Sequence, residues 1–137
     1  MNSTTLQKKI FDTSALKRFL SDEKGSDEMA KMLEDGLKKN ENLLVSTLSV
    51  YELALIMGRR NVEEAVVAIS FIEKICRFIS PNTEISQNAA LLKIKHPKAD
   101  ISMADAIILQ TGIKERAEII TADKEWKKIV EADVKII

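Results

Sequence analysis

Cysteine, histidine and aromatic residues are scarce in this sequence of 137 residues, and each scarcity excludes a class of chemistry. With Cys76 as the single cysteine, no disulfide can form within the chain, and its apolar surroundings, FIEKICRFI, predict a buried, unreactive thiol. With His96 as the single histidine, a nuclease mechanism that uses two histidines is excluded. A Ser-His-Asp triad would depend on this residue of the polar segment KHPKAD, where we expect a solvated side chain. Aromatic residues make up only 4% of the chain, so base stacking cannot be the main contact to a nucleic acid.

The sequence also lacks a long apolar run and an excess of charge of either sign. No segment approaches the ~20 apolar residues that cross a bilayer, and residues 1–12 contain no apolar signal core, so we expect a cytoplasmic protein outside the membrane. Lys plus Arg and Asp plus Glu number 21 each, which leaves no net field to attract a polyanion. A nucleic-acid partner would therefore need local contacts. The candidates are Lys17, Arg18, Arg59 and Arg60, which also fit the description of exposed helix ends.

Short apolar runs alternate with amphipathic segments along the chain, which we interpret as one domain over residues 1–137. We expect strands over residues 9–11, 43–46, 77–79, 118–121 and 134–137. We expect helices that end near residues 20, 39, 60, 75, 93, 116 and 130, with Ser26, Asn61 and Ser102 as capping residues at the start of three of them. Strands that alternate with helices predict an α/β fold, in which a mostly parallel sheet is covered on both faces.

Four acidic residues lie where these predicted elements meet. Asp12 and Asp123 follow strands, while Glu52 and Asp105 fall in the first turn of helices, and sites in open parallel sheets form at the carboxyl ends of strands. All four can therefore converge on one edge of the sheet. Each also has an ordinary structural explanation as a capping residue, and the pattern Ser49-x-x-Glu52 has the form of a capping box.

Carboxylates gathered in this way are expected to need a cation. Two unit charges ~5 Å apart repel by about 3 kcal/mol at an effective dielectric of ~20. Oxygen ligands favour Mg²⁺ or Mn²⁺ over Zn²⁺, which prefers histidine or cysteine. The residues therefore favour metal-assisted hydrolysis, with phosphate esters as the natural class of substrate.

The strings IFDTSAL, SVYEL, SMADAIIL and IITADKEW, in this order over nearly the whole chain, resemble the PIN-domain nucleases, most closely the single-domain VapC-type ribonuclease toxins. The resemblance implies a three-layer α/β/α sandwich with a mostly parallel five-stranded sheet. It also implies Mg²⁺- or Mn²⁺-dependent cleavage of single-stranded RNA, a homodimer and an antitoxin partner. Asp12, Glu52, Asp105 and Asp123 match the four acids of the family. In this reading the three aspartates are metal ligands and Glu52 is a ligand or a base that orients water.

Further positions match the family more loosely. Ser14 and Thr121 correspond to small hydroxyl residues beside the acids, and both also fit helix or turn capping. Glu125 falls where some relatives carry a fifth acid. Trp126 stands where phenylalanine is common, and we expect it in the core.

Two other families with an acidic site fit the sequence less well. Haloacid-dehalogenase phosphatases need an aspartate two residues after the first, where this chain has Ser14, and receiver domains need an acidic pair that Asp12 lacks. A stand-alone PIN RNA-processing nuclease stays open, as does a non-catalytic PIN-like scaffold that binds RNA or protein.

Overall fold

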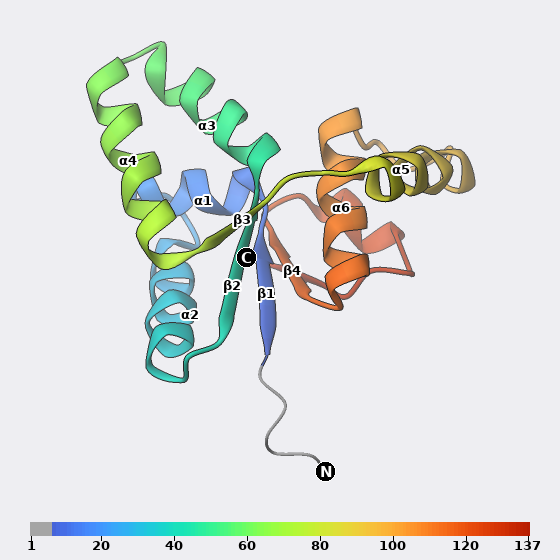
Figure 1. Ribbon diagram of the computed structural model, residues 1–137, viewed down its shortest axis with the longest axis horizontal. Helices are drawn as coiled ribbons and strands as arrows, with labels where there is room; N and C mark the ends of the chain where they lie inside the picture. The colour runs from blue at the N-terminus through green and yellow to red at the C-terminus, as the bar shows by residue number, and fades with distance from the viewer. Residues whose placement is uncertain (1–6) are drawn as a thin grey trace.

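A five-stranded parallel sheet forms the middle layer of the molecule (Figure 1). The computed structural model describes residues 7–137. The strands are β1 Lys8–Phe11, β2 Asn42–Ser46, β3 Arg77–Ile79, β4 Glu118–Thr121 and β5 Val134–Ile136. Their order is β3-β2-β1-β4-β5, so the chain winds outward from β1 in one direction and then from β4 in the other. The boundary between β1 and β4 is the topological switch point, where α/β sheets build their sites.

Helices cover both faces of this sheet. The helices are α1 Thr13–Leu20, α2 Ser26–Lys38, α3 Thr47–Gly58, α4 Val62–Ile75, α5 Thr83–Lys95 and α6 Met103–Glu115, with the 3₁₀ helix η1 at Lys124–Lys128. The first four lie on one side of the sheet and α5 and α6 lie on the other (Figure 1). The predicted three-layer α/β/α sandwich with five parallel strands is therefore confirmed.

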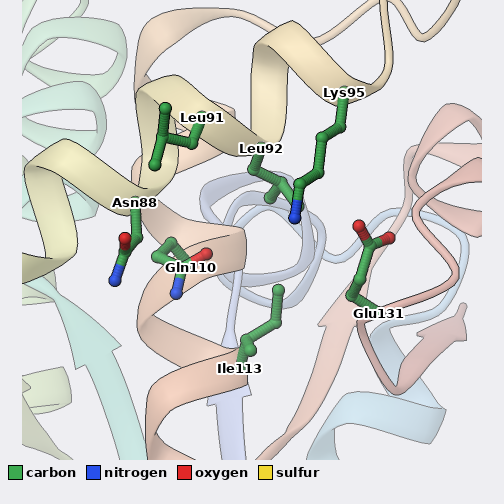
Figure 2. A pocket seen from close by; sticks show the side chains of 7 residues that line it. All are labelled: Asn88, Leu91, Leu92, Lys95, Gln110, Ile113 and Glu131. Atoms are coloured by element: carbon green, nitrogen blue, oxygen red, sulfur yellow. The ribbon is translucent and has the colours of Figure 1, made fainter.

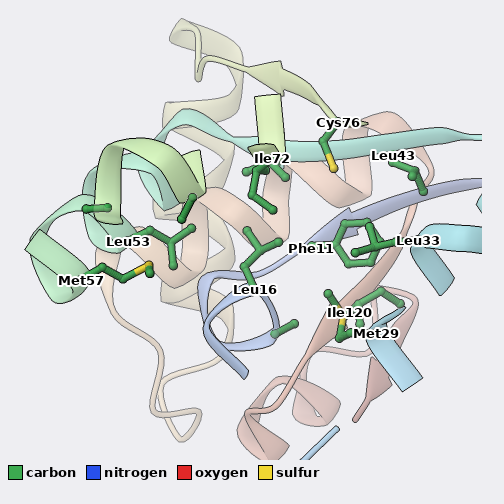
Figure 3. Packing of buried hydrophobic residues seen from close by; sticks show 14 residues of the cluster. Phe11, Leu16, Met29, Leu33, Leu43, Leu53, Met57, Ile72, Cys76 and Ile120 are labelled. Atoms are coloured by element: carbon green, nitrogen blue, oxygen red, sulfur yellow. The ribbon is translucent and has the colours of Figure 1, made fainter. Parts of the chain in front are cut away.

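Two separate apolar cores hold the layers together. Phe11 and Ile120 point to the core under α1 to α4, where Leu53 and Ile72 pack against them (Figure 3). Their chain neighbours Ile10 and Ile119 point to the opposite core, as the two-residue repeat of a strand requires. Trp126 belongs to this second core with none of its side chain exposed, as predicted.

The close packing of α6 against the sheet depends on Gly112. A Cβ atom at this position would stand 2.4 Å from the Cγ1 of Ile119 in β4. The absence of a side chain therefore lets α6 lie this close to β4.

The start of α3 differs from the prediction. Ser46 is the N-cap, and its side chain accepts a hydrogen bond from the backbone N–H of Leu48 at 3.2 Å. The predicted capping box from Ser49 to Glu52 is therefore wrong, because both residues lie inside the helix. The next capping signal is correct, since the side chain of Asn61 accepts from the N–H of Glu64 at 3.0 Å.

Smaller differences occur at other helix ends. The N-cap of α2 is Gly25, whose φ of 93° favours glycine, rather than the predicted Ser26. The helix predicted up to residue 93 continues to Lys95. The last helical segment is the short 3₁₀ helix η1 instead of an α-helix to residue 130.

The single cysteine and the single histidine both lie in well-defined surroundings. Cys76 is buried, as predicted, and burial raises the pKa of its thiol to about 12. His96 is not freely solvated as expected, because its Nε2 lies 2.8 Å from the Oε1 of Glu131. Within residues 7–137, no helix combines the length and the apolar character needed to cross a bilayer.

Candidate active site

Asp12 lies at the carboxyl end of β1, with only 5% of its surface exposed. It occupies the N-cap position of α1 but makes no capping hydrogen bond with its side chain, so the capping explanation for this residue is wrong. Its Oδ2 instead accepts hydrogen bonds from the Oγ of Ser14 at 2.6 Å and the Oγ1 of Thr121 at 2.8 Å. Burial raises the pKa of the Asp12 carboxyl from its ordinary value of 3.8 to about 6, against these two hydrogen bonds.

The two hydroxyl groups also join the ends of β1 and β4. The Oγ of Ser14 accepts from the backbone N–H of Ala122 at 3.0 Å, and the Oγ1 of Thr121 accepts from the N–H of Asp123 at 3.1 Å. Ser14 and Thr121 are themselves 3.2 Å apart. The switch point is thus closed by a small polar network in which every hydroxyl both donates and accepts.

Asp105 stands in the first turn of α6, where it completes a capping box. Its N–H donates to the Oγ of Ser102 at 3.1 Å, and the N–H of Ser102 donates to its Oδ2 at 3.0 Å. Burial raises the pKa of the Asp105 carboxyl, and the charges of Asp123 and Asp100 raise it further. The capping explanation therefore holds for Asp105, and the residue also lies in an acidic neighbourhood.

Asp123 follows β4 and caps η1, because its Oδ1 accepts from the N–H of Glu125 at 2.9 Å. The charge of Asp105 raises the pKa of Asp12, as that of Asp123 raises the pKa of Asp105. The three aspartates are therefore electrostatic neighbours at one edge of the sheet, although they come from three different parts of the chain.

Glu52 reaches this edge from the second turn of α3 and not from its first turn. Its Oε1 accepts a hydrogen bond of 2.6 Å from the Oγ1 of Thr13, the residue next to Asp12. Thr13 also lies 2.9 Å from the Oγ of Ser49. The sequence reasoning missed Thr13 and misread Ser49 as a cap. The sequence feature that could have indicated this contact is a threonine directly after Asp12.

The donor set fits a hard divalent cation in its chemistry. The four acids offer only carboxylate oxygens, and no Lys or Arg in the described chain is among the groups that shift the pKa of Asp12 or Asp105. Across residues 7–137, no three acidic, histidine or cysteine side chains stand close enough to hold one ion as they are placed. The side chains of the site would therefore have to adjust around an ion.

Glu125 and the basic candidates lie in ordinary surface contacts. The Oε1 of Glu125 accepts from the Nζ of Lys128 at 2.8 Å and from the N–H of Asp100 at 3.2 Å. Lys17 pairs with Glu23 at 2.9 Å, and Arg18 donates to a backbone carbonyl at 3.3 Å.

The other two basic candidates, Arg59 and Arg60, follow the last turn of α3. Both are exposed, and among the residues that the structure describes neither takes part in an ion pair. Within residues 7–137, Lys17 is the one of the four predicted basic residues that pairs with an acid, and Arg59 and Arg60 are exposed at the end of α3.

A surface pocket lies between α5 and α6, away from these acids. Leu91, Leu92 and Ile113 line it, with Lys95 and Glu131 at its rim, and none of the four acids contributes to it (Figure 2). Asp12 and Asp123 follow the carboxyl ends of β1 and β4 instead.

The PIN domain family matches residues 9–132 of the chain. Among solved structures, VapBC2 from Rickettsia felis bound to a promoter DNA fragment is similar, with a TM-score of 0.82, 17% identity and coverage of 95% of this chain and 98% of that one. VapBC-1 from nontypeable Haemophilus influenzae has a TM-score of 0.74 at 19% identity, with coverage of 95% and 98%. VapC20 from Mycobacterium tuberculosis, a sarcin-ricin loop cleaving toxin, has a TM-score of 0.73 at 14% identity, with coverage of 92% and 98%. No curated protein matches the chain by sequence.

Proposed function

The chain belongs to the PIN-domain family, and from this premise we propose that it is a metal-dependent endoribonuclease that cleaves single-stranded RNA. The observation that carries the proposal is the buried carboxylate of Asp12 at the switch point of the sheet. Burial raises its pKa to about 6, and the nearby charge of Asp105 adds to the increase. Perturbed carboxyl groups of this kind gather at functional sites more often than elsewhere.

The proposed metal ion is Mg²⁺ or Mn²⁺, with Asp12, Asp105 and Asp123 as ligands and Glu52 as a ligand or a base that orients water. When bound, such an ion activates water and neutralises charge on a phosphodiester. The protein contributes the placement of the carboxylates. Two hydroxyl donors hold the Oδ2 of Asp12, and a capping box holds Asp105.

The supporting roles are divided among residues around these acids. Ser14 and Thr121 orient Asp12 through their hydrogen bonds. Glu125 is a further acid beside the site, although its carboxylate already receives the ammonium group of Lys128.

RNA is the proposed substrate because the family match and the acidic donor set both favour phosphodiester hydrolysis, and because one structural neighbour is a toxin that cleaves the sarcin-ricin loop. Arg59 and Arg60 are the better candidates for contacts to the RNA backbone. Lys17 and Arg18 are the weaker ones, since both already bond within the turn between α1 and α2. With a net charge of zero, RNA is expected to bind through local contacts that salt weakens.

A role as the toxin of a VapBC-type toxin-antitoxin pair agrees with the solved neighbours, several of which are VapBC complexes. The chain also presents an apolar surface on α4. Val62, Val66 and Val67 are 68%, 59% and 69% exposed, which is unusual for valine outside a protein contact. We propose an antitoxin and a second copy of the chain as its partners, in the cytoplasm. Met29 of α2, by contrast, is fully buried and cannot contribute to a contact surface.

The proposal is tested by incubating the purified chain with a panel of single-stranded RNAs in Mg²⁺, in Mn²⁺ and in EDTA. We expect cleavage in either metal and none in EDTA. Asp12→Asn and Asp105→Asn should each abolish cleavage, while Asp27→Asn, which changes an exposed acid of α2, should leave it unchanged. Cleavage that survives both site substitutions would overturn the site assignment, and cleavage in EDTA would overturn the metal dependence.

A further inference from the structure

Glu52 lies on α3, far from Asp12 along the chain. Its carboxylate accepts a hydrogen bond from Thr13, the residue next to Asp12. The Oγ1 of Thr13 lies 2.6 Å from the Oε1 of Glu52, a short distance for a hydroxyl bound to a carboxylate. Thr13 itself is only 7% exposed. This contact is partly buried, and a hydrogen bond shielded from water is stronger than one in water.

The direction of the hydrogens follows from elementary chemistry. A hydroxyl group carries one hydrogen, and a carboxylate can only accept. Thr13 is the donor in both of its contacts, at 2.6 Å to the Oε1 of Glu52 and at 2.9 Å to the Oγ of Ser49. Its single hydrogen favours the shorter contact, because the carboxylate of Glu52 is the stronger acceptor.

We propose that Thr13 is a positioning residue, which holds the Glu52 carboxylate toward the proposed metal site that Asp12, the neighbour of Thr13, helps to form. The inference rests on the function proposed above. Because Thr13 is the first residue of α1 and follows Asp12 directly, one dipeptide at the end of β1 supplies a carboxylate and orients another. The branched Cβ of threonine restricts rotation about χ1, so the hydroxyl is held in place before a substrate arrives.

The hydrogen bond explains how Glu52 serves the site from the second turn of α3. A glutamate has three rotatable side-chain torsions, and a carboxylate free to sample them would be oriented for only part of the time. Groups that orient a reacting or metal-binding residue are typically worth 10- to 100-fold in affinity or activity. Loss of the Thr13 hydroxyl is expected to fall in this range, although Thr13 itself touches neither metal nor RNA.

The test compares Thr13→Val, Thr13→Ser and Ser49→Ala with the wild-type chain. For Thr13→Val we expect kcat to fall about 10- to 100-fold with little change in the KM for RNA. Thr13→Ser keeps the hydroxyl and should restore most of kcat. Ser49→Ala removes the longer contact of Thr13 and leaves the one to Glu52, so kcat should stay close to that of the wild type. Thr111→Val is the matched control, because it removes a buried threonine hydroxyl that donates to a backbone carbonyl in α6 instead.

A double-mutant cycle with Glu52→Ala supplies a second readout that does not need a loaded enzyme. In EDTA, the unfolding midpoints of Thr13→Val and Glu52→Ala should be non-additive, because each substitution removes the same hydrogen bond. In the presence of Mg²⁺ or Mn²⁺, Thr13→Val should have no further effect on kcat in a chain that already carries Glu52→Ala.

The outcomes separate the two proposals. If the wild-type chain cleaves RNA but the Thr13 and Glu52 substitutions act additively, only the positioning role is overturned. If Thr13→Ser is as impaired as Thr13→Val, the hydroxyl is not the cause and the positioning role is again overturned. If the wild-type chain cleaves no RNA under any metal condition, the proposed function fails and the positioning role fails with it, even where the unfolding midpoints remain coupled.

Discussion

The Oγ1 of Thr121 donates a hydrogen bond of 2.8 Å to the Oδ2 of Asp12, a residue 109 positions earlier in the chain. Both residues lie at the carboxyl ends of adjacent parallel strands, where Thr121 is fully buried and Asp12 is only 5% exposed. The contact therefore ties the first strand of the fold to the fourth at the point where the proposed metal ligands gather.

Removal of this hydrogen bond is expected to reduce both stability and activity. Thr121→Val leaves Asp12 with one hydroxyl donor fewer and the N–H of Asp123 without its acceptor. We expect the free energy of unfolding to fall by about 1–3 kcal/mol, measured by urea titration, because a buried group is left unsatisfied. We expect metal affinity or activity to fall about 10- to 100-fold. Thr121→Ser retains the hydroxyl, and an equally large loss in this variant would show that the methyl group matters instead.

Asp12→Asn is expected to stabilise the metal-free protein while it abolishes cleavage. The pKa of Asp12 is about 6 in the folded chain against an ordinary 3.8, so between these values the folded chain binds more protons than the unfolded one. The free energy of unfolding of the wild type should therefore fall as pH rises from about 4 to 6, by up to about 3 kcal/mol. Asparagine carries no such charge and should remove this part of the pH dependence.

The measurement is a series of urea titrations in EDTA from pH 4 to 8, on the wild type and Asp12→Asn. The variant should be the more stable at pH 7, and the difference should vanish near pH 4. Asp27→Asn, which changes an exposed acid of α2, serves as the control and should run parallel to the wild type. Equal curves for all three proteins would contradict the raised pKa.

Divalent metal should reverse this order of stability. An ion that binds only the folded wild type adds about 2.7 kcal/mol at a concentration of 100 times its Kd. We expect Mn²⁺ to raise the Tm of the wild type and to leave the Tm of Asp12→Asn nearly unchanged, as measured by calorimetry. A similar increase in both proteins would place the ion elsewhere.

Gly112→Ala tests whether the packing of α6 controls the site. A new Cβ would stand 2.4 Å from Cγ1 and 2.5 Å from Cδ1 of Ile119, so the helix or the isoleucine must move. Overpacking of this kind typically costs about 1–3 kcal/mol. Since Asp105 lies on the same helix, cleavage should fall as well.

Gly58→Ala is the matched control for that substitution. The nearest atom to a Cβ at this position is 4.0 Å away, and the residue ends α3. The variant should be neutral or more stable by up to about 1 kcal/mol, with cleavage unchanged. If the two glycine variants behaved alike, close packing between α6 and β4 would not be the cause.

The start of α3 offers a prediction about stability alone. Ser46→Ala removes the side chain that caps this helix and should lower the free energy of unfolding by about 0.5–2 kcal/mol. The readout is a urea titration of the variant and the wild type in parallel. An unchanged midpoint would indicate that Ser46 does not act as the cap.

Local patterns were sufficient to predict the layers of the fold. The five strands and the caps at Asn61 and Ser102 follow from short-range hydrogen bonding and apolar periodicity, which depend on neighbours within a few residues. The start of α3 was missed for the same reason, because Ser46 and Ser49 are equally plausible caps until burial decides between them. Ser49 is fully buried against Thr13, which no local pattern reveals.

The sequence predicted only part of the candidate site. The order of the four acids and their places at element ends could be recognised, because the carboxyl ends of parallel strands must share an edge. The contact of Thr13 with Glu52 depends on how α1 and α3 pack, and the hydrogen bonds at Asp12 depend on which residue of β4 faces it. Side-chain contacts between distant segments are fixed by tertiary packing and not by propensity.

The strand order has a consequence for the time at which the site can exist during synthesis. β1 is made before the other strands and stands at the centre of the sheet, but its neighbour β4 begins only at Glu118, after α1 to α6 have been made. A nascent chain that has not yet released β4 carries Asp12 without Thr121, Asp123 or the strand that fixes them. A prematurely terminated fragment is in the same condition. Assembly of this edge therefore waits until β4 has been made.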